Sequence, residues 1–251
     1  MRQPLQRAQA PVRPAPWSLY QKAASPSASR RQRYDGFVLS IEIFSDIVCP
    51  WCFIGKRRLE SAIVRVTQDN PTFECQLRWR PFFLNPDTPP EGEPYLPFLE
   101  RKFGGRRQVE VLFERVRSAG HGCGIEFAFE KIRLRANTLS AHRLLHWAQE
   151  RGNADPLVER LFSAQFQRGE HVGDAAVLVR IAAECGYDPG DAAACLSQGR
   201  YEDVVRANER EARQMGITMI PTFVFDGRIL IVGAQEPAIL AESIGQALHS
   251  R

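Results

Sequence analysis

Cys49 and Cys52 are the residues of this chain best placed to do chemistry, because only a proline and a tryptophan separate them. The pair stands between an apolar, β-branched run at 37–46 and a segment at 52–68 whose apolar residues recur near helical spacing. A cysteine at a helix N-terminus meets free N–H groups and the positive end of the helix dipole, and both favour its thiolate. The spacing therefore predicts thiol–disulfide exchange, with Cys49 as nucleophile and Cys52 as the resolving thiol.

Half of a zinc site is the alternative interpretation of the same two cysteines. Structural zinc takes four ligands, so it needs a second pair of suitable residues at a set spacing. The sequence contains no second CxxC, but His142 and His146 lie four residues apart on a predicted helix. Since nothing else supports a two-cysteine, two-histidine site, we expect no bound metal.

Four further cysteines lie far apart in the sequence: Cys75, Cys123, Cys185 and Cys195. A disulfide framework is typical of short secreted chains, and this chain has 251 residues. We therefore expect these four to be reduced, mostly buried thiols outside the redox centre. The N-terminus lacks a continuous apolar region of the kind that secretory signals contain, which favours a reducing compartment.

The middle of the chain differs in pattern from its two ends. Predicted strands at 37–46 and 73–84 flank the helix that follows the CxxC, and a proline-rich loop covers 85–94. From 95 to 216 the pattern is helical, with breaks at glycines and prolines. The sequence thus predicts an α/β domain with an all-helical domain inserted between its two halves.

The last part of the chain completes the predicted α/β domain. Residues 221–225 and 229–232 are typical of a hairpin across Asp226-Gly227, and a helix is predicted at 236–248. The predicted boundaries are 37–94 and 201–251 for the α/β domain and 95–200 for the helical domain.

Residues 1–36 are rich in Pro, Ala, Ser, Gln and Arg, and we expect them to be disordered. The first 34 carry seven basic residues and no acidic one, so the net charge of +4 comes from this segment and does not indicate nucleic-acid binding. An organellar transit peptide is one interpretation, but its prolines disfavour an amphipathic helix. The other is an extension from an upstream start codon. A transit peptide would predict a mitochondrial protein, and an upstream extension a cytoplasmic one. No apolar run in the sequence is long enough for a membrane helix.

Three segments resemble the DsbA-type thioredoxin-fold proteins, and in particular their FrnE-like branch, which includes proteins named 2-hydroxychromene-2-carboxylate isomerases. They are FSDIVCPWCFIGKRRLE at 44–60, RANTLSAHRLLHWA at 135–148 and GITMIPTFVFDGRILIVGAQ at 216–235. The resemblance runs from about 39 to 248, with the motifs in the family's order. It implies a thioredoxin-like fold with an inserted helical domain.

The resemblance also implies roles for particular residues. Pro221 matches the family's cis-proline beside the nucleophile, and Ile220 before it offers backbone that can pair with a substrate. Pro50 and Trp51 are then expected to contact the substrate with Ile220. The expected activity is that of a thiol–disulfide oxidoreductase or disulfide isomerase, and the expected substrates are protein or small-molecule disulfides and thiols. No cofactor is implied beyond the Cys49–Cys52 disulfide, with glutathione as a candidate co-substrate.

Several interpretations stay open at this level. A glutathione-dependent isomerase of small aromatic compounds is the alternative function, although the resemblance leads us to expect serine in such relatives where this chain has Cys49. Asn137 or Thr138 is expected to cap a helix, or, with His142 and Arg143, to line the cleft. Trp51 and Phe53 either contact a partner or pack around the helix start.

Overall fold

The computed structural model describes residues 38–250, so the expectations for 1–36 lie outside it. The elements, in chain order, are β1 (Val38–Ser45), α1 (Pro50–Asp69), β2 (Glu74–Pro81), β3 (Glu93–Pro94), α2 (Tyr95–Phe103), α3 (Arg106–His121), the 3-10 turn η2 (Phe129–Lys131), β4 (Leu134–Arg135), α4 (Leu139–Gln149), α5 (Asp155–Ser163), the π-helical turn η3 (Ala164–Arg168), α6 (Ala175–Glu184), α7 (Pro189–Ser197), α8 (Glu202–Gln214), β5 (Thr222–Phe225), β6 (Ile229–Val232) and α9 (Pro237–His249). The predicted strands, hairpin and final helix are confirmed.

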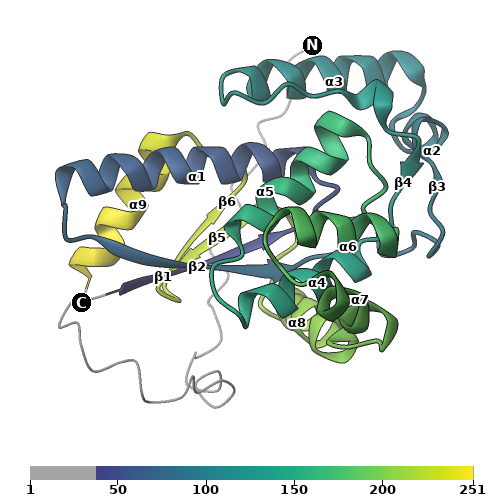
Figure 1. The fold of residues 1–251 in the computed structure, drawn as a ribbon. Helices are drawn as coiled ribbons and strands as arrows, with labels where there is room; N and C mark the ends of the chain where they lie inside the picture. Colours follow the sequence, from purple (N-terminus) through teal and green to yellow (C-terminus); the bar gives the residue numbers. More distant parts are fainter. Residues whose placement is uncertain (1–37, 251) are drawn as a thin grey trace, which may run out of the picture.

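A four-stranded sheet in the order β2-β1-β5-β6 joins the N-terminal strands β1 and β2 to the C-terminal strands β5 and β6. β1 and β2 are parallel, as a strand–helix–strand unit requires, while β5 lies antiparallel to both β1 and β6. The helix that joins the parallel pair, α1, lies beside α9 on one face of the sheet (Figure 1). The central strand β1 therefore ends next to the start of β5, which places Cys49 near Pro221.

Side chains of β1 alternate between two covered faces. Leu39, Ile41 and Ile43 enter the core cluster that also contains residues of α1 and α9. Phe44 points the other way and packs in a second cluster with Ala212 of α8. The sheet is thus enclosed by helices on both sides, with α8, the helix that follows the predicted inserted domain, covering the second face.

The inserted helices share their apolar core with the sheet domain. Phe53 of α1 stacks on Phe162 of α5, with ring centroids 5.1 Å apart, and Trp79 of β2 meets the same ring edge-on at 6.5 Å. Buried side chains of the sheet, α1 and the insertion form one contiguous cluster. Phe53 is therefore a packing residue, and the insertion helps to orient the helix that follows Cys49. The predicted domain boundaries stay a prediction.

One pairing was not foreseen from the sequence. Glu93–Pro94 pairs antiparallel with Leu134–Arg135 as β3 and β4, inside the segment predicted as a loop and just before α4. A two-residue ladder carries no alternating pattern that a sequence could show. Among the described residues, no helix is long and apolar enough to cross a membrane.

Candidate active site

Cys49 is the N-cap residue of α1, with an extended backbone at φ −97° and ψ 110°. Its N–H donates to the Asp46 carbonyl at 3.0 Å, and its own carbonyl accepts the Cys52 N–H at 3.0 Å. The helix begins at Pro50, two residues earlier than predicted, because a proline at the first helical position gives up no intrahelical hydrogen bond. The Cys49 side chain is 4% exposed and stands at the positive end of a 20-residue helix.

Cys52 lies beneath Cys49 and is fully enclosed. Burial raises the pKa of the Cys52 thiol well above its ordinary value, and a side-chain hydrogen bond to Cys49 and the charge of that sulfur raise it further. In the reduced protein, Cys52 therefore keeps its proton while Cys49 is the sulfur next to open space. This asymmetry is what a nucleophilic Cys49 and a resolving Cys52 would need.

The Ile220–Pro221 peptide bond is cis, as the resemblance implied. The Pro221 carbonyl accepts a hydrogen bond from the Gly233 N–H at 2.7 Å, which ties the loop to the end of the hairpin. On the other side, a Cβ added to Gly55 of α1 would stand 2.8 Å from Pro221 Cγ. The proline ring thus contacts the helix backbone at a distance that only glycine permits.

A cavity of about 270 Å³ opens on Cys49. Pro50, Trp51 and Ile220, the residues predicted to contact substrate, all line it. The remaining walls come mainly from α2 and α3; Figure 1 shows α3 above the N-terminal part of α1. Arg115 of α3 lies over the Trp51 ring at 5.7 Å, so this half-buried indole forms the contact between the redox turn and the insertion.

Tyr95, the first residue of α2, is a site residue that the sequence did not single out. Its ring lines the cavity and stacks on Phe113 of α3, with centroids 6.4 Å apart. Burial, and then the negative charge of Cys49, raise the pKa of Tyr95. The phenol therefore keeps its proton at neutral pH and is a hydrogen-bond donor within the electrostatic reach of Cys49.

The motif at 135–148 reaches the redox turn through one buried pair. His142 Nε2 lies 3.3 Å from Asp46 Oδ1, and the two side chains are 3% and 1% exposed. The other carboxylate oxygen of Asp46 accepts the Leu84 N–H at 2.8 Å. Since the Asp46 carbonyl holds the Cys49 N–H, His142 supports the turn on which the nucleophile stands.

The predicted helix cap in the same motif falls at Thr138, the N-cap residue of α4, which makes no side-chain cap hydrogen bond; the first helical N–H is bonded instead by the preceding residue, Asn137. Its side-chain oxygen accepts the Leu139 N–H at 3.1 Å, and its amide donates to the Thr88 carbonyl at 2.8 Å. Arg143 donates to the carbonyls of Arg200, Cys195 and Leu196 at the end of α7. These two residues and Thr138 do not line the cavity at Cys49, so their contacts are structural.

Comparison with known proteins decides the family. Residues 40–245 match the family described as the DSBA-like thioredoxin domain. The chain belongs to this family. The predicted thioredoxin-like α/β fold is thereby confirmed, as is the resemblance to DsbA-type proteins.

Individual relatives of this DsbA-like protein cover most of its length. The uncharacterized protein YwbO of Bacillus subtilis is 28% identical over 205 residues, which are 81% of this chain and 94% of that protein. The crystal structure of a probable DsbA oxidoreductase from Streptomyces coelicolor has a TM-score of 0.76 at 32% identity and covers 85% of this chain and 91% of that one. The cytosolic disulfide reductase DsbM from Pseudomonas aeruginosa, solved with GSH, has a TM-score of 0.57 at 17% identity, over 83% and 98% of the two chains, and shows the fold alone.

The expectation that the four other cysteines of this DsbA-like protein are mostly buried was wrong. Cys195 is buried, but Cys75, Cys123 and Cys185 are partly exposed, and all six cysteines of the structure are free thiols. Cys75 lies on the edge strand β2, Cys123 in the turn after α3 and Cys185 at the end of α6. Positions at edges and helix ends keep one side open to solvent.

Cys75 is expected to react slowly with alkylating reagents although it is partly exposed. Burial and the charge of Asp155 raise the pKa of Cys75 to about 11, from an ordinary 9.0. Only the thiolate reacts, so its fraction at pH 8 is about 100-fold lower than for an ordinary thiol. The pH dependence of iodoacetamide labelling, followed by peptide mass spectrometry, should show a rate for Cys75 that still rises above pH 10. Labelling at pH 8 as fast as that of free cysteine would contradict this.

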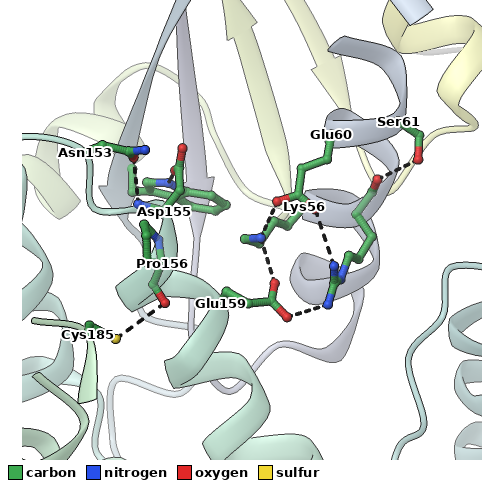
Figure 2. Close-up of polar contacts among 10 residues, drawn as sticks. Lys56, Glu60, Ser61, Asn153, Asp155, Pro156, Glu159 and Cys185 are labelled. Atoms are coloured by element: carbon green, nitrogen blue, oxygen red, sulfur yellow. Dashed lines mark hydrogen bonds and ion pairs between the residues drawn. The ribbon is translucent and has the colours of Figure 1, made fainter. Parts of the chain in front are cut away.

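A second polar cluster of the DsbA-like fold joins α1 to the insertion (Figure 2). Lys56, one turn after Cys52, is 4% exposed, and its ammonium group donates to Glu60 at 2.5 Å and to Glu159 of α5 at 2.7 Å. Glu159 also accepts from Arg57. The buried cation is thus paired on two sides, and the pairing fixes the redox helix against α5. Across the described residues, no group of three or more His, Cys, Asp or Glu could hold a metal ion.

His142→Leu is expected to destabilise the protein by about 1–3 kcal/mol, because it leaves the enclosed Asp46 carboxylate with one backbone donor. His146→Leu is the matched control one turn later on α4. His146 lies 3.6 Å from Glu150, whose side chain is half exposed, so its loss should cost much less. Urea denaturation of both variants checks the difference, and equal losses would argue against a structural role for the His142–Asp46 pair.

Proposed function

We propose that this DsbA-like protein is a thiol–disulfide oxidoreductase whose reactive dithiol is Cys49 and Cys52. The observation that carries the proposal is the asymmetry of the two thiols at the start of α1. Cys49 caps the helix and borders the cavity, while burial keeps Cys52 protonated beneath it. The cis Ile220–Pro221 bond stands beside them, with Pro221 against Gly55 on the same helix.

The exchange follows from these positions. The Cys49 thiolate attacks one sulfur of a substrate disulfide, forms a mixed disulfide and expels the other half as a thiolate. Cys52 then gives up its proton and attacks Cys49 sulfur, which closes the Cys49–Cys52 disulfide and releases the second half. Two electrons pass from the dithiol to the substrate. Two molecules of glutathione, our candidate co-substrate, would return the protein to the dithiol and leave as glutathione disulfide.

The isomerase alternative is weaker because of one residue. The resemblance leads us to expect serine at the nucleophile position of such relatives, and this chain has Cys49 with a second thiol hydrogen-bonded to it. The cytoplasmic location and the absence of a cofactor stay predictions from the sequence.

The full-length protein tests the proposal directly. Oxidised protein should yield a Cys49–Cys52 disulfide on peptide mapping, and catalytic amounts should accelerate disulfide reduction by glutathione or dithiothreitol. The reduction potential of the pair then separates a reductase from an oxidase, since a tenfold change in the equilibrium corresponds to about 30 mV. Free thiols at both positions after oxidation, or no acceleration with any disulfide, would refute the assignment.

A further inference from the structure

The position of Cys49 restricts what can reach it. Its side chain is 4% exposed, and the open space next to it is the 270 Å³ cavity under α2 and α3. Val109, Phe113 and Val116 of α3 form part of the wall, and Arg115 packs on Trp51. A polypeptide chain could bring a disulfide to Cys49 only by entering this space beside α2 and α3. A small molecule needs only to fit inside it.

The cavity walls are rich in aromatic side chains. Phe113 and Phe129 stack with centroids 4.2 Å apart, and Tyr95, Phe98 and Phe103 complete this part of the lining. A dry cavity of about 150 Å³ already accommodates a benzene ring. The volume here therefore suits one substituted ring and is too small for a folded segment.

One buried polar side chain, Gln165, borders the cavity without a partner. It is 2% exposed, and no residue that the structure describes hydrogen-bonds to its amide. The side-chain atoms that are both fully buried and unpartnered do not include the Gln165 amide, so this amide keeps some contact with open space. The open space next to Gln165 is the cavity. Gln165 lies in the π-helical turn Ala164–Arg168, a geometry that is frequent at functional sites. Its amide can both donate to and accept from a ligand.

The mouth of the cavity carries positive charge. Lys102 is exposed at the end of α2, lines the cavity, and donates to the Asn85 side chain at 3.0 Å. The other cation of the wall, Arg135, is paired with Glu93 and lies 3.8 Å above the Phe98 ring. The lining residues include no Asp or Glu. An anionic group on a bound ring is thus favoured near Lys102.

We propose that the cavity binds a low-molecular-weight disulfide with an aromatic, anionic half, whose ring lies among the phenylalanines, with a polar substituent at Gln165 and its anionic group toward Lys102. This inference rests on the proposed function. Cys49 attacks the ring-bearing disulfide, one half leaves as a thiolate, and Cys52 then releases the second half as it closes the Cys49–Cys52 disulfide. The two electrons come from the protein dithiol alone, so one turnover needs no added reductant.

Single-turnover kinetics of the reduced full-length chain test this. The probes are dithiobis(nitrobenzoate), which is aromatic and anionic, dithiodipyridine, which is aromatic and neutral, hydroxyethyl disulfide, which is aliphatic, and insulin. Each rate is divided by that of dithiothreitol with the same disulfide, which removes the intrinsic reactivity of the probe. The normalised rate should be highest for dithiobis(nitrobenzoate) and should saturate with its concentration. It should be lowest for insulin.

Two variants assign the effect to the cavity. Gln165→Leu keeps the volume but removes the amide, and should lower the preference for dithiobis(nitrobenzoate) over hydroxyethyl disulfide by up to about tenfold. Lys102→Gln should lower the preference for dithiobis(nitrobenzoate) over dithiodipyridine by about two- to fivefold, since the charge is exposed. Arg101→Gln is the matched control, because Arg101 is the neighbouring cation on α2, pairs with Glu93 and does not line the cavity.

The outcomes separate this inference from the function on which it rests. Insulin reduced with a normalised rate equal to or above that of the aromatic probe would overturn the small-molecule assignment and leave the oxidoreductase standing. If neither Gln165→Leu nor Lys102→Gln changes the preference for dithiobis(nitrobenzoate), the cavity is not the binding site. If no disulfide reacts faster than with dithiothreitol, the proposed function itself fails, and this inference fails with it.

Discussion

Cys49→Ser is expected to slow disulfide reduction by at least about 10³-fold, because serine offers no thiolate to attack sulfur. The helix N-terminus, the cavity and the cis-proline loop all remain in this variant, so only the nucleophile changes. Turnover of hydroxyethyl disulfide with dithiothreitol as reductant measures the effect. Cys123→Ser is the control, since Cys123 is a partly exposed free thiol in the turn after α3. A rate within tenfold of the parent protein for Cys49→Ser would place the nucleophile elsewhere.

Cys52→Ser separates attack from resolution. The Cys49 thiolate can still form a mixed disulfide, but no second thiol can release it, so the adduct should accumulate. Intact-mass measurement after mixing with hydroxyethyl disulfide detects the adduct as one added half of the reagent on Cys49. The parent protein should instead show no lasting adduct and an internal disulfide. An adduct on Cys75, Cys185 or Cys195 would be unexpected, because burial raises the pKa of all three thiols.

The parts of the site that could be predicted from the sequence are local. Cys49, Pro50 and Cys52 lie within four consecutive residues, and the change in apolar period around them predicts a strand-to-helix turn. The cis peptide bond at Pro221 could be predicted only from the family resemblance, because the local sequence of a proline before a strand does not distinguish the cis from the trans isomer. The order of strands and helices then sufficed to expect an α/β domain with a helical insertion.

The cavity could not be predicted because its walls meet only in the folded chain. Tyr95, Phe113 and Gln165 come from α2, α3 and η3, and each is unremarkable beside its sequence neighbours. His142 and Asp46 are 96 residues apart, so no local pattern pairs them. Pairing of this kind depends on how α4 docks beside the sheet, which propensity does not determine.

The presence of glycine at position 55 is likewise explained only by the three-dimensional structure. A glycine inside a helix costs about 0.5–1 kcal/mol relative to alanine, so the sequence alone marks it as unfavourable. In the structure its missing side chain lets the α1 backbone contact Pro221 and Phe223, which a Cβ would meet at 2.8 Å and 3.1 Å. The close approach, and not the helix, explains the residue.

Gly55→Ala is therefore expected to lower the free energy of unfolding by about 1–3 kcal/mol, the usual range for overpacking a tight contact. The proline ring is rigid and its loop is tied to Gly233, so the clash can be relieved only by moving α1 or the loop away from each other. Either movement shifts Pro221 relative to Cys49, and disulfide reduction should fall along with stability. Urea denaturation and turnover of hydroxyethyl disulfide measure the two effects.

Gly245→Ala in α9 supplies the matched control, because the same change is made in a helix interior with no atom within 4 Å of the added Cβ. Here only the helix preference for alanine acts, and the variant should gain about 0.5–1 kcal/mol of stability with unchanged turnover. Opposite signs at the two glycines would attribute the loss at Gly55 to its contact with Pro221. A gain at both positions would mean that α1 and the cis-proline loop tolerate greater separation, and the positioning role given to Gly55 would be wrong.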